Sequence, residues 1–160
     1  MPKPVENENY IPPLSEISGA TINDLSGKCC VVTGGGSGIG AMITAGFVAN
    51  GATVFIVSRK DTSPFASKVM AAYPGKCFAL RADLAKEEDV VRLSSELREA
   101  CPDGKLHCLV NNSGTNWAEP IDEYSLKGWD KVYDLNVRSV FHVTQQLLPL
   151  LRASGTRSNP

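Results

Sequence analysis

Five glycines fall within seven residues of the segment Thr33–Gly40, which reads Thr-Gly-Gly-Gly-Ser-Gly-Ile-Gly. An apolar run at 29–33 precedes this segment and apolar residues at helical spacing follow it over 39–47, so it predicts a turn between a strand and a helix. At such a turn the backbone amides and the positive end of the helix dipole attract an anion, and glycine lets the backbone approach it closely. The pattern favours a diphosphate ligand, with these candidate contacts: Thr33, Gly34, Ser37, Gly38, Ile39 and Gly40.

The glycine segment has two other interpretations, a P-loop and a turn without a ligand. A phosphate-binding P-loop is excluded, because no Gly-Lys-Ser/Thr follows to supply a lysine for the terminal phosphates and a hydroxyl for magnesium. A turn that only carries the chain from strand to helix remains an alternative, although such a turn seldom needs five glycines.

Two cationic residues follow the second apolar run, Thr53–Val57, in the order Ser58-Arg59-Lys60. NAD sites place a carboxylate here, which accepts hydrogen bonds from the ribose 2′-hydroxyl and would repel a 2′-phosphate. Arg59 can instead pair with that phosphate through two charge-assisted hydrogen bonds, with Ser58 as a neutral donor and Lys60 as a second cation. We therefore predict NADP(H) rather than NAD(H) as the cofactor. The alternative, a pair of solvated loop charges, is more reasonable for Lys60 than for Arg59.

Segments typical of strands and of helices alternate from Gly27 onward. The predicted strands are 29–33, 53–57, 77–80 and 106–110, and the predicted helices are 39–50, 64–73, 87–97 and 129–151. Because every strand is a continuous apolar run, we expect a parallel sheet covered on both faces, which with right-handed crossovers is the doubly wound α/β, or Rossmann, fold. A methyltransferase is the main alternative among such proteins, but it would place a carboxylate after the second strand to hold its cofactor's ribose hydroxyls.

Two helices have a predicted buried face. In the third helix this face consists of Val90, Leu93 and Leu97. In the fourth, the predicted apolar stripe consists of Trp129, Tyr133, Val140, Thr144, Leu147 and Leu151. Asn136 lies on this stripe, and burying its amide would cost about 1–3 kcal/mol unless its hydrogen bonds are satisfied. We expect Asn136 to have a partner, and a purely structural role has about the same weight as a functional one.

Four motifs occur in the order typical of one protein family. They are Thr33-Gly34-x-x-x-Gly38-x-Gly40, Asp83-Leu84, Asn111-Asn112-Ser113-Gly114 and Asn136. In these motifs the chain resembles the classical short-chain dehydrogenases/reductases over roughly Gly27 to Ala153. Its general sequence pattern is most similar to that of 3-oxoacyl and related carbonyl reductases. Ser113 stands where the family usually has alanine, a small polar change that we expect the fold to tolerate.

The resemblance implies roles for these residues. Asp83 and Leu84 would contact the adenine, and Asn112, Ser113 and Gly114 would also belong to the cofactor site. Asn136 would be the catalytic-site asparagine, which helps to hold a water connected to the catalytic lysine. The family's strand order, 3-2-1-4-5, implies an incomplete sheet of about four strands in the order 3-2-1-4 here. Because the family commonly packs the last of these helices against a second subunit, the resemblance also implies a homo-oligomer in the full-length protein.

The residues that would donate a proton are missing. Hydride transfer to a carbonyl needs a proton donor, which the family supplies with a serine and a Tyr-x-x-x-Lys motif, but none of the four tyrosines has a lysine four residues later. We therefore expect the cofactor-binding part of an NADP-dependent oxidoreductase (EC 1.1.1 type) for a small carbonyl or alcohol substrate, truncated before its catalytic residues and doubtful as a catalyst alone. A non-catalytic dinucleotide-binding or interaction protein is the alternative.

Composition limits the partners and the location. With 160 residues, 42% of them hydrophobic, the chain fits one globular domain, which we place at 27–160 as an NADP-binding domain incomplete at its C-terminal end, after an extended lead-in at 1–26. The net charge of −1 offers no general attraction to nucleic acid or to anionic membranes. No apolar run approaches the roughly 20 residues of a membrane span. Residues 1–10 lack the pattern of a secretory signal, so we expect a cytoplasmic protein.

The cysteines and histidines suggest no chemistry. The five cysteines include no CxxC pair and no histidine at metal-ligand spacing, so we expect free, buried thiols and no metal site. His107 and His142 are expected to be structural or surface residues, because His107 lies in a predicted strand and His142 lies one turn or more from Asn136, on another face of its helix.

Overall fold

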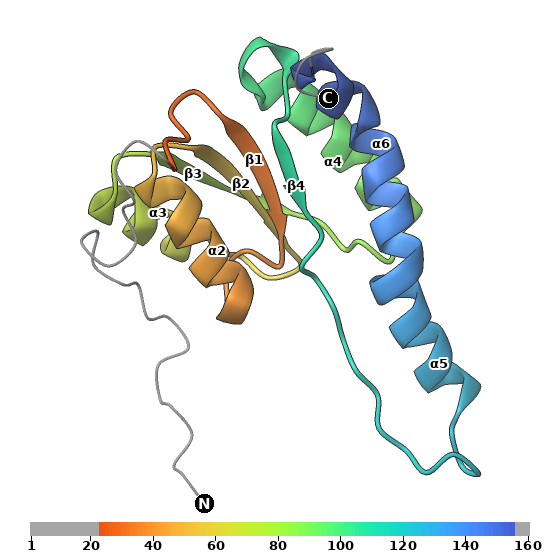
Figure 1. Cartoon of the computed structure of the whole chain (residues 1–160). Helices are drawn as coiled ribbons and strands as arrows, with labels where there is room; N and C mark the ends of the chain where they lie inside the picture. The colour runs from red at the N-terminus through yellow and green to blue at the C-terminus, as the bar shows by residue number, and fades with distance from the viewer. Residues whose placement is uncertain (1–22, 156–160) are drawn as a thin grey trace, which may run out of the picture.

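The computed structural model describes residues 23–155, so most of the predicted lead-in at 1–26 lies outside the described part of the chain. Strands and helices alternate along it (Figure 1). The strands are β1 (Cys29–Thr33), β2 (Thr53–Ser58), β3 (Lys76–Arg81) and β4 (Cys108–Val110). The α-helices are α2 (Gly38–Ala49), α3 (Ser63–Ala72), α4 (Glu87–Ala100), α5 (Leu126–Tyr133) and α6 (Ser139–Ser154), with a 3₁₀ turn at Pro102–Gly104 and a π-helical turn at Asp134–Arg138.

The four strands form one parallel sheet in the order β3-β2-β1-β4. Val31 at the centre of β1 is paired with Phe55 on one side and with Leu109 on the other. Every residue of β1 is buried, as expected for a central strand covered on both faces. The predicted fold class and strand order are confirmed.

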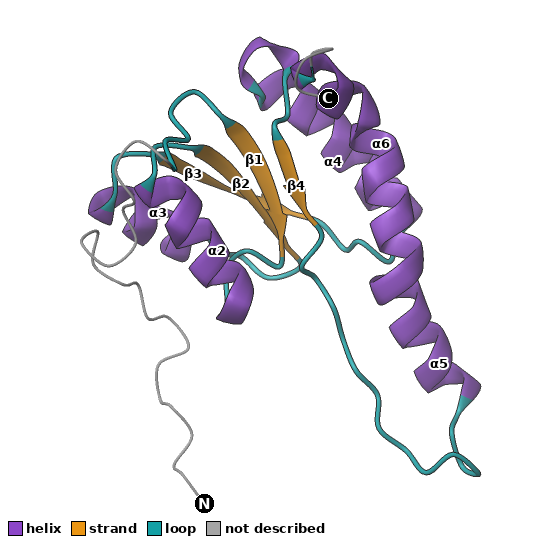
Figure 2. Cartoon of the chain, viewed as in Figure 1, coloured by secondary structure: helices purple, strands orange, loops and turns teal. Residues whose placement is uncertain are grey.

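Successive residues of the central strands enter two separate cores, because side chains alternate between the faces of a sheet. Val31 and Val57 belong to the core under α4 and α6, whereas Val32 and Ile56 belong to the core under α2 and α3. Figure 2 shows these two helical layers on either side of the strands. The predicted buried face of the third helix is confirmed, since Val90, Leu93 and Leu97 are at most 1% exposed.

The predicted stripe of the last helix is right only in part: Leu147 is buried and Leu151 packs against the core, but Val140 and Thr144 are half-buried. The buried residues of α6 are Ser139, Val143, Leu147 and Leu150. Trp129 and Tyr133, which open the predicted stripe, are 60% and 44% exposed. A single helical period does not run through this segment, because the π-helical turn between α5 and α6 widens the helix. In addition, α5 extends past the sheet (Figure 1).

All five cysteines are free thiols, as expected, and all but Cys108 are buried. The Sγ atoms of Cys29 and Cys101 lie 3.3 Å apart, at the junction between β1 and the end of α4. Burial raises the pKa of the Cys77 thiol to about 12, which keeps it protonated and inert near neutral pH. Across residues 23–155 no helix has the length and apolarity to cross a bilayer, and no cluster of three or more His, Cys, Asp or Glu side chains could hold a metal ion.

Candidate functional site

The glycine turn lies between β1 and α2, at the carboxyl edge of the sheet. Gly34 has φ +66°, a conformation that side chains with a Cβ rarely adopt. A Cβ on Gly40 would collide with the carbonyl oxygen of Gly34 and come within 2.6 Å of Asn112 Nδ2. The turn therefore needs glycine at both positions in order to fold tightly against the start of α2.

The start of α2 presents unsatisfied donors to the cleft. Ser37 is the N-cap residue, and its side chain makes no capping hydrogen bond. The N–H of Ala41 bonds to the carbonyl of Ser37, so the amides before Ala41 belong to the first turn, which has no intrahelical acceptors. No acidic side chain occupies this turn. The free amides and the helix dipole together give this end of α2 a positive partial charge, which suits a phosphate group.

A cleft of about 430 Å³ runs along this edge and brings together most of the predicted cofactor residues. Those that line it are Gly34, Ser37, Ile39, Gly40, Ser58, Arg59, Lys60, Asp83, Leu84, Asn112, Ser113 and Gly114. Of the predicted cofactor residues, Thr33 and Gly38 do not line it. Residues at or just after the ends of all four strands thus line one cavity, the usual location of a ligand in open parallel sheets.

Three lining residues were not predicted from the sequence: Val57, Ala82 and Leu135. Val57 and Ala82 lie at the carboxyl ends of β2 and β3 and are adjacent in sequence to the predicted residues Ser58 and Asp83. This adjacency could have identified them from the sequence. Leu135 belongs to the π-helical turn, whose approach to the cleft is set by tertiary packing and not by local sequence.

Thr33 does not line the cleft, but it makes hydrogen bonds to residues that do. It is 1% exposed, and its Oγ1 accepts hydrogen bonds from the backbone N–H groups of Asn112 (3.0 Å) and Ser113 (2.9 Å). In return, the side-chain amide of Asn112 donates to the carbonyl of Thr33 at 2.9 Å. These bonds fix the Asn-Asn-Ser-Gly segment after β4 against the glycine turn after β1.

The loop after β2 carries the cationic residues. The backbone N–H of Lys60 donates to Ser58 Oγ at 3.2 Å, which folds the loop over Arg59. Asp61 lies nearby, but its carboxylate accepts a hydrogen bond from the N–H of Ser63 (2.9 Å) at the start of α3. The hydrogen bonds from Ser63 lower the pKa of Asp61. Its charge is therefore partly engaged at the start of α3, beyond the position where an NAD site places its acid.

Asp83 and Leu84, which follow β3 and precede α4, also line the cleft. The backbone N–H of Asp83 donates to Asp89 Oδ2 at 2.7 Å, and Leu84 is 6% exposed. The pKa of Asp89 is lowered first by this bond and second by a hydrogen bond from Arg92. The first turns of α4 thus hold the backbone of the Asp83-Leu84 segment in place.

Asn136 is exposed, so the prediction that it is buried on an apolar stripe is wrong. It lies in the π-helical turn, where the widened backbone turns it away from the buried face of α6. The expected partner does exist: the Asn136 amide accepts from the N–H of Thr115 (2.9 Å) and donates to its carbonyl (2.8 Å). Asn136 does not line the cleft, but it tethers the loop that leaves Gly114.

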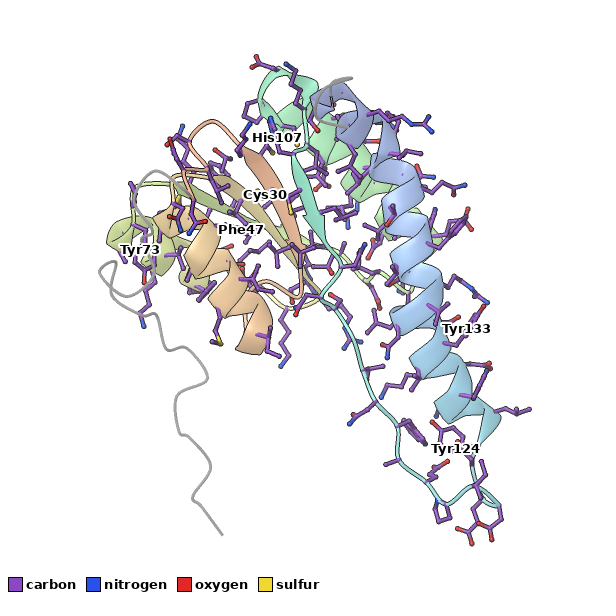
Figure 3. The ribbon with its side chains drawn as sticks, in the orientation of Figure 1. Cys30, Phe47, Tyr73, His107, Tyr124 and Tyr133 are labelled. Carbon is purple, nitrogen blue, oxygen red and sulfur yellow. The ribbon has the colours of Figure 1, made fainter. Side chains whose placement is uncertain are left out.

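The aromatic and imidazole groups of the described chain lie away from the cleft. Tyr124 and Tyr133 lie beyond the sheet, at α5 and the loop before it, and the Tyr124 hydroxyl donates to the carbonyl of Trp117 at 3.1 Å (Figure 3). His107 lies at the opposite end of β4 from the cleft, and its Nδ1 accepts from the N–H of Cys29 at 3.0 Å. Within residues 23–155, no tyrosine or histidine lines the cleft. His107 has the structural role expected of it.

Known proteins resemble this chain in sequence and in structure. Residues 28–158 match the short chain dehydrogenase family. A 3-oxoacyl-[acyl-carrier-protein] reductase of rhamnolipid biosynthesis from Pseudomonas aeruginosa is 43% identical over 136 residues, which cover 85% of this chain and 52% of the relative. The structure of the Pseudomonas aeruginosa RhlG/NADP complex superposes with a TM-score of 0.80 at 44% identity, covering 86% of this chain and 53% of that one.

A third similar structure is L-sorbose reductase from Gluconobacter frateurii complexed with NADPH and L-sorbose, with a TM-score of 0.75 at 31% identity, covering 80% of this chain and 49% of that one. The chain therefore spans about half the length of the relatives it matches. The family match covers most of the chain and includes the glycine turn, the cationic loop and the Asn-Asn-Ser-Gly segment. This chain belongs to the short chain dehydrogenase family.

Proposed function

We propose that this chain binds NADP(H) and provides the cofactor site of an oxidoreductase that transfers hydride between NADP(H) and a small carbonyl or alcohol substrate. The observation that carries the proposal is the cleft itself, whose lining combines the uncapped first turn of α2 with Arg59 and Lys60. The diphosphate would lie at the α2 N-terminus, and the adenosine would extend toward Asp83 and Leu84.

The charges near the end of β2 support NADP(H) over NAD(H). A 2′-phosphate there would meet the Arg59 guanidinium, whose planar fork suits phosphate oxygens, and the Lys60 ammonium. No carboxylate directly follows β2, and the Asp61 carboxylate is engaged with Ser63. The relatives point the same way, since the two similar structures are complexes with NADP and NADPH.

The reaction class is supported by the relatives alone. One is a 3-oxoacyl-[acyl-carrier-protein] reductase, and the sorbose reductase acts on a ketose, so both names point to carbonyl reduction. When bound, the nicotinamide would supply the hydride. The residues of this chain would position the dinucleotide, and Asn136 would hold the loop that leaves Gly114 beside the cleft.

A non-catalytic dinucleotide-binding protein is the second candidate, because no tyrosine of this chain has a lysine four residues later to help it donate a proton. The two candidates differ in turnover. We expect the purified chain to bind NADPH without steadily oxidising it when ketones are added. Sustained turnover with a ketone would show that a proton donor exists within these residues and would remove the second candidate.

Calorimetric titration of the folded chain tests the cofactor assignment. We expect NADPH to bind at least tenfold more tightly than NADH, and Arg59→Ala to reduce this preference by removing a charged hydrogen-bond donor of about 1.5–3 kcal/mol. Arg98→Ala is the matched control, since it removes the same charge from the last turn of α4. Equal affinity for the two dinucleotides, unaffected by Arg59→Ala, would contradict the assignment, and a folded chain that binds neither would contradict the proposed function.

A further inference from the structure

Arg81 reaches the predicted phosphate-binding loop from the neighbouring strand. It is the last residue of β3, in register with Ser58 at the end of β2. Its side-chain Nε donates a hydrogen bond to the carbonyl of Arg59, 3.0 Å away and 22 residues earlier in the chain. The backbone of the residue predicted to bind the phosphate is therefore held by the side chain of another arginine.

The rest of the Arg81 guanidinium remains available. Within the described residues, its two Nη atoms have no hydrogen-bond or ion-pair partner. A guanidinium that uses only its Nε toward the protein keeps a pair of donors that matches two oxygens of one phosphate. The same group also contributes to lowering the pKa of Asp61, after the hydrogen bonds from Ser63, which places its charge close to the loop 59–61.

A second hollow of about 490 Å³ adjoins the cofactor cleft at this point, and Arg59, Ala82 and Asp83 line both. Arg81, Lys86 and Arg92 add further positive charge to the hollow. Arg92 is already neutralised by Asp89 (3.0 Å) and Glu96 (2.6 Å). The side chains that line the hollow comprise four cations, Arg59, Arg81, Lys86 and Arg92, and two carboxylates, Asp83 and Asp89, and this excess of positive charge favours an anion.

Arg81 is itself fixed by α4. Arg92 Nη2 donates to the carbonyl of Arg81 at 2.8 Å, and the Asp89 carboxylate joins Arg92 to the backbone N–H of Asp83. One chain of contacts therefore runs from the Arg59 loop through Arg81 and Arg92 to the Asp83 segment. This arrangement sets the spacing between the two loops on either side of the predicted adenosine.

We propose that Arg81 is a specificity-determining residue of this site, which holds Arg59 in place and supplies a second guanidinium to the 2′-phosphate of a 2′-phosphorylated adenosine nucleotide. The inference rests on the proposed function, because the cleft must accept such a nucleotide. The inference adds to the proposed cofactor site a residue of β3, whereas the cationic loop follows β2.

The probes that test this role are adenosine 2′,5′-bisphosphate and adenosine 5′-monophosphate, which differ only in the 2′-phosphate. We expect Arg81→Gln to weaken binding of the bisphosphate by about tenfold or more, the effect typical of losing a charged hydrogen bond, and to leave binding of the monophosphate unchanged. Arg81→Lys keeps the charge but lacks the planar fork, so we expect an intermediate loss.

Arg98→Gln serves as the matched control, because it removes one arginine charge from the far end of α4 and should change neither affinity. Equal weakening of both nucleotides by Arg81→Gln would indicate a purely structural role and overturn the inference, as would no weakening of either. If the wild-type chain itself does not prefer the bisphosphate, the proposed function fails. If it does, and only Arg59→Ala removes the preference, the proposed function stands and the role of Arg81 fails. Far-ultraviolet circular dichroism confirms that each variant is folded.

Discussion

The hydroxyl of Thr33 accepts a hydrogen bond from the backbone N–H of Asn112, 3.0 Å away, and so joins the ends of two strands that are 79 residues apart in the sequence. The N–H of the next residue, Ser113, donates to the same oxygen. Two adjacent N–H groups of the segment after β4 thus share a single acceptor at the end of β1, and one buried side chain joins these two parts of the site.

Thr33→Val keeps the shape of this side chain but removes the acceptor. The N–H of Asn112 would keep its hydrogen bond to the carbonyl of Val110 (3.0 Å), but the N–H of Ser113 would lose its acceptor. We therefore expect a loss of about 1–3 kcal/mol in the free energy of unfolding, together with weaker NADPH binding. Urea unfolding and calorimetric titration measure the two effects. Thr53→Val is the control, because the side chain of Thr53 is half-buried at the opposite end of the sheet. Equal effects of the two substitutions would contradict the role given to Thr33.

Two glycines of α2 offer a matched pair of substitutions. In Gly40→Ala the added methyl group collides with the carbonyl of Gly34, so we expect a lower melting temperature and loss of NADPH binding. Gly46→Ala meets no atom within 4 Å, and it should raise stability by about 0.4–1 kcal/mol and leave binding intact. Differential scanning fluorimetry with and without NADPH distinguishes the two. A Gly40→Ala variant that still binds NADPH normally would show that the tight turn is not required.

His107 gives the chain a pH dependence below neutrality. Burial lowers its pKa from the ordinary value of 6.5, with smaller effects from Lys28 and Lys105. Its Nδ1 accepts the N–H of Cys29, which only a neutral ring can do. The unfolded chain therefore binds a proton more readily, and the contribution of His107 is fully present above about pH 6.5 and is lost as the pH falls through the window below it.

We expect His107→Gln to flatten this part of the profile, since the variant has no ring to protonate. Urea unfolding at several values between about pH 7.5 and about pH 5 measures the slope. His142→Gln is the control and should retain the wild-type slope. If both variants follow the wild-type profile, the acid sensitivity arises elsewhere.

Apolar side chains on α5 and the turn after it predict self-association, as the resemblance also implied. Leu126, Trp129 and Val137 are 80%, 60% and 49% exposed, and they line an apolar hollow of about 540 Å³. Exposed apolar surface of this extent favours contact with another molecule. We expect sedimentation velocity to show dimers or larger species, and Trp129→Gln combined with Val137→Gln to shift them toward monomer. Val91→Gln, at a 44% exposed position on α4, should not; a monomeric wild type would contradict the prediction.

Much of the fold and the site was predictable because it depends on local pattern. Continuous apolar runs identified the four strands, and the polar or glycine residues that follow each run identified most of the cleft. The position of α5 and the exposure of Asn136 were not predictable, because a π-helical turn leaves no periodic signal in the sequence. The contact of Arg81 with Arg59 depends on the register between β2 and β3, which only the assembled sheet reveals.

The short edge strand β4 has a consequence for the lifetime of the chain. The three residues of β4 are only half-buried. Hydrogen bonds from the N–H groups of Asn112 and Ser113, which follow its C-terminal end, anchor that end to Thr33. A dinucleotide in the cleft would contact the ends of all four strands at once, so β4 could not detach without releasing it. At a ligand concentration one hundred times the dissociation constant this linkage is worth about 2.7 kcal/mol. Resistance to proteases that cleave the detached edge should therefore rise and fall with the supply of the dinucleotide.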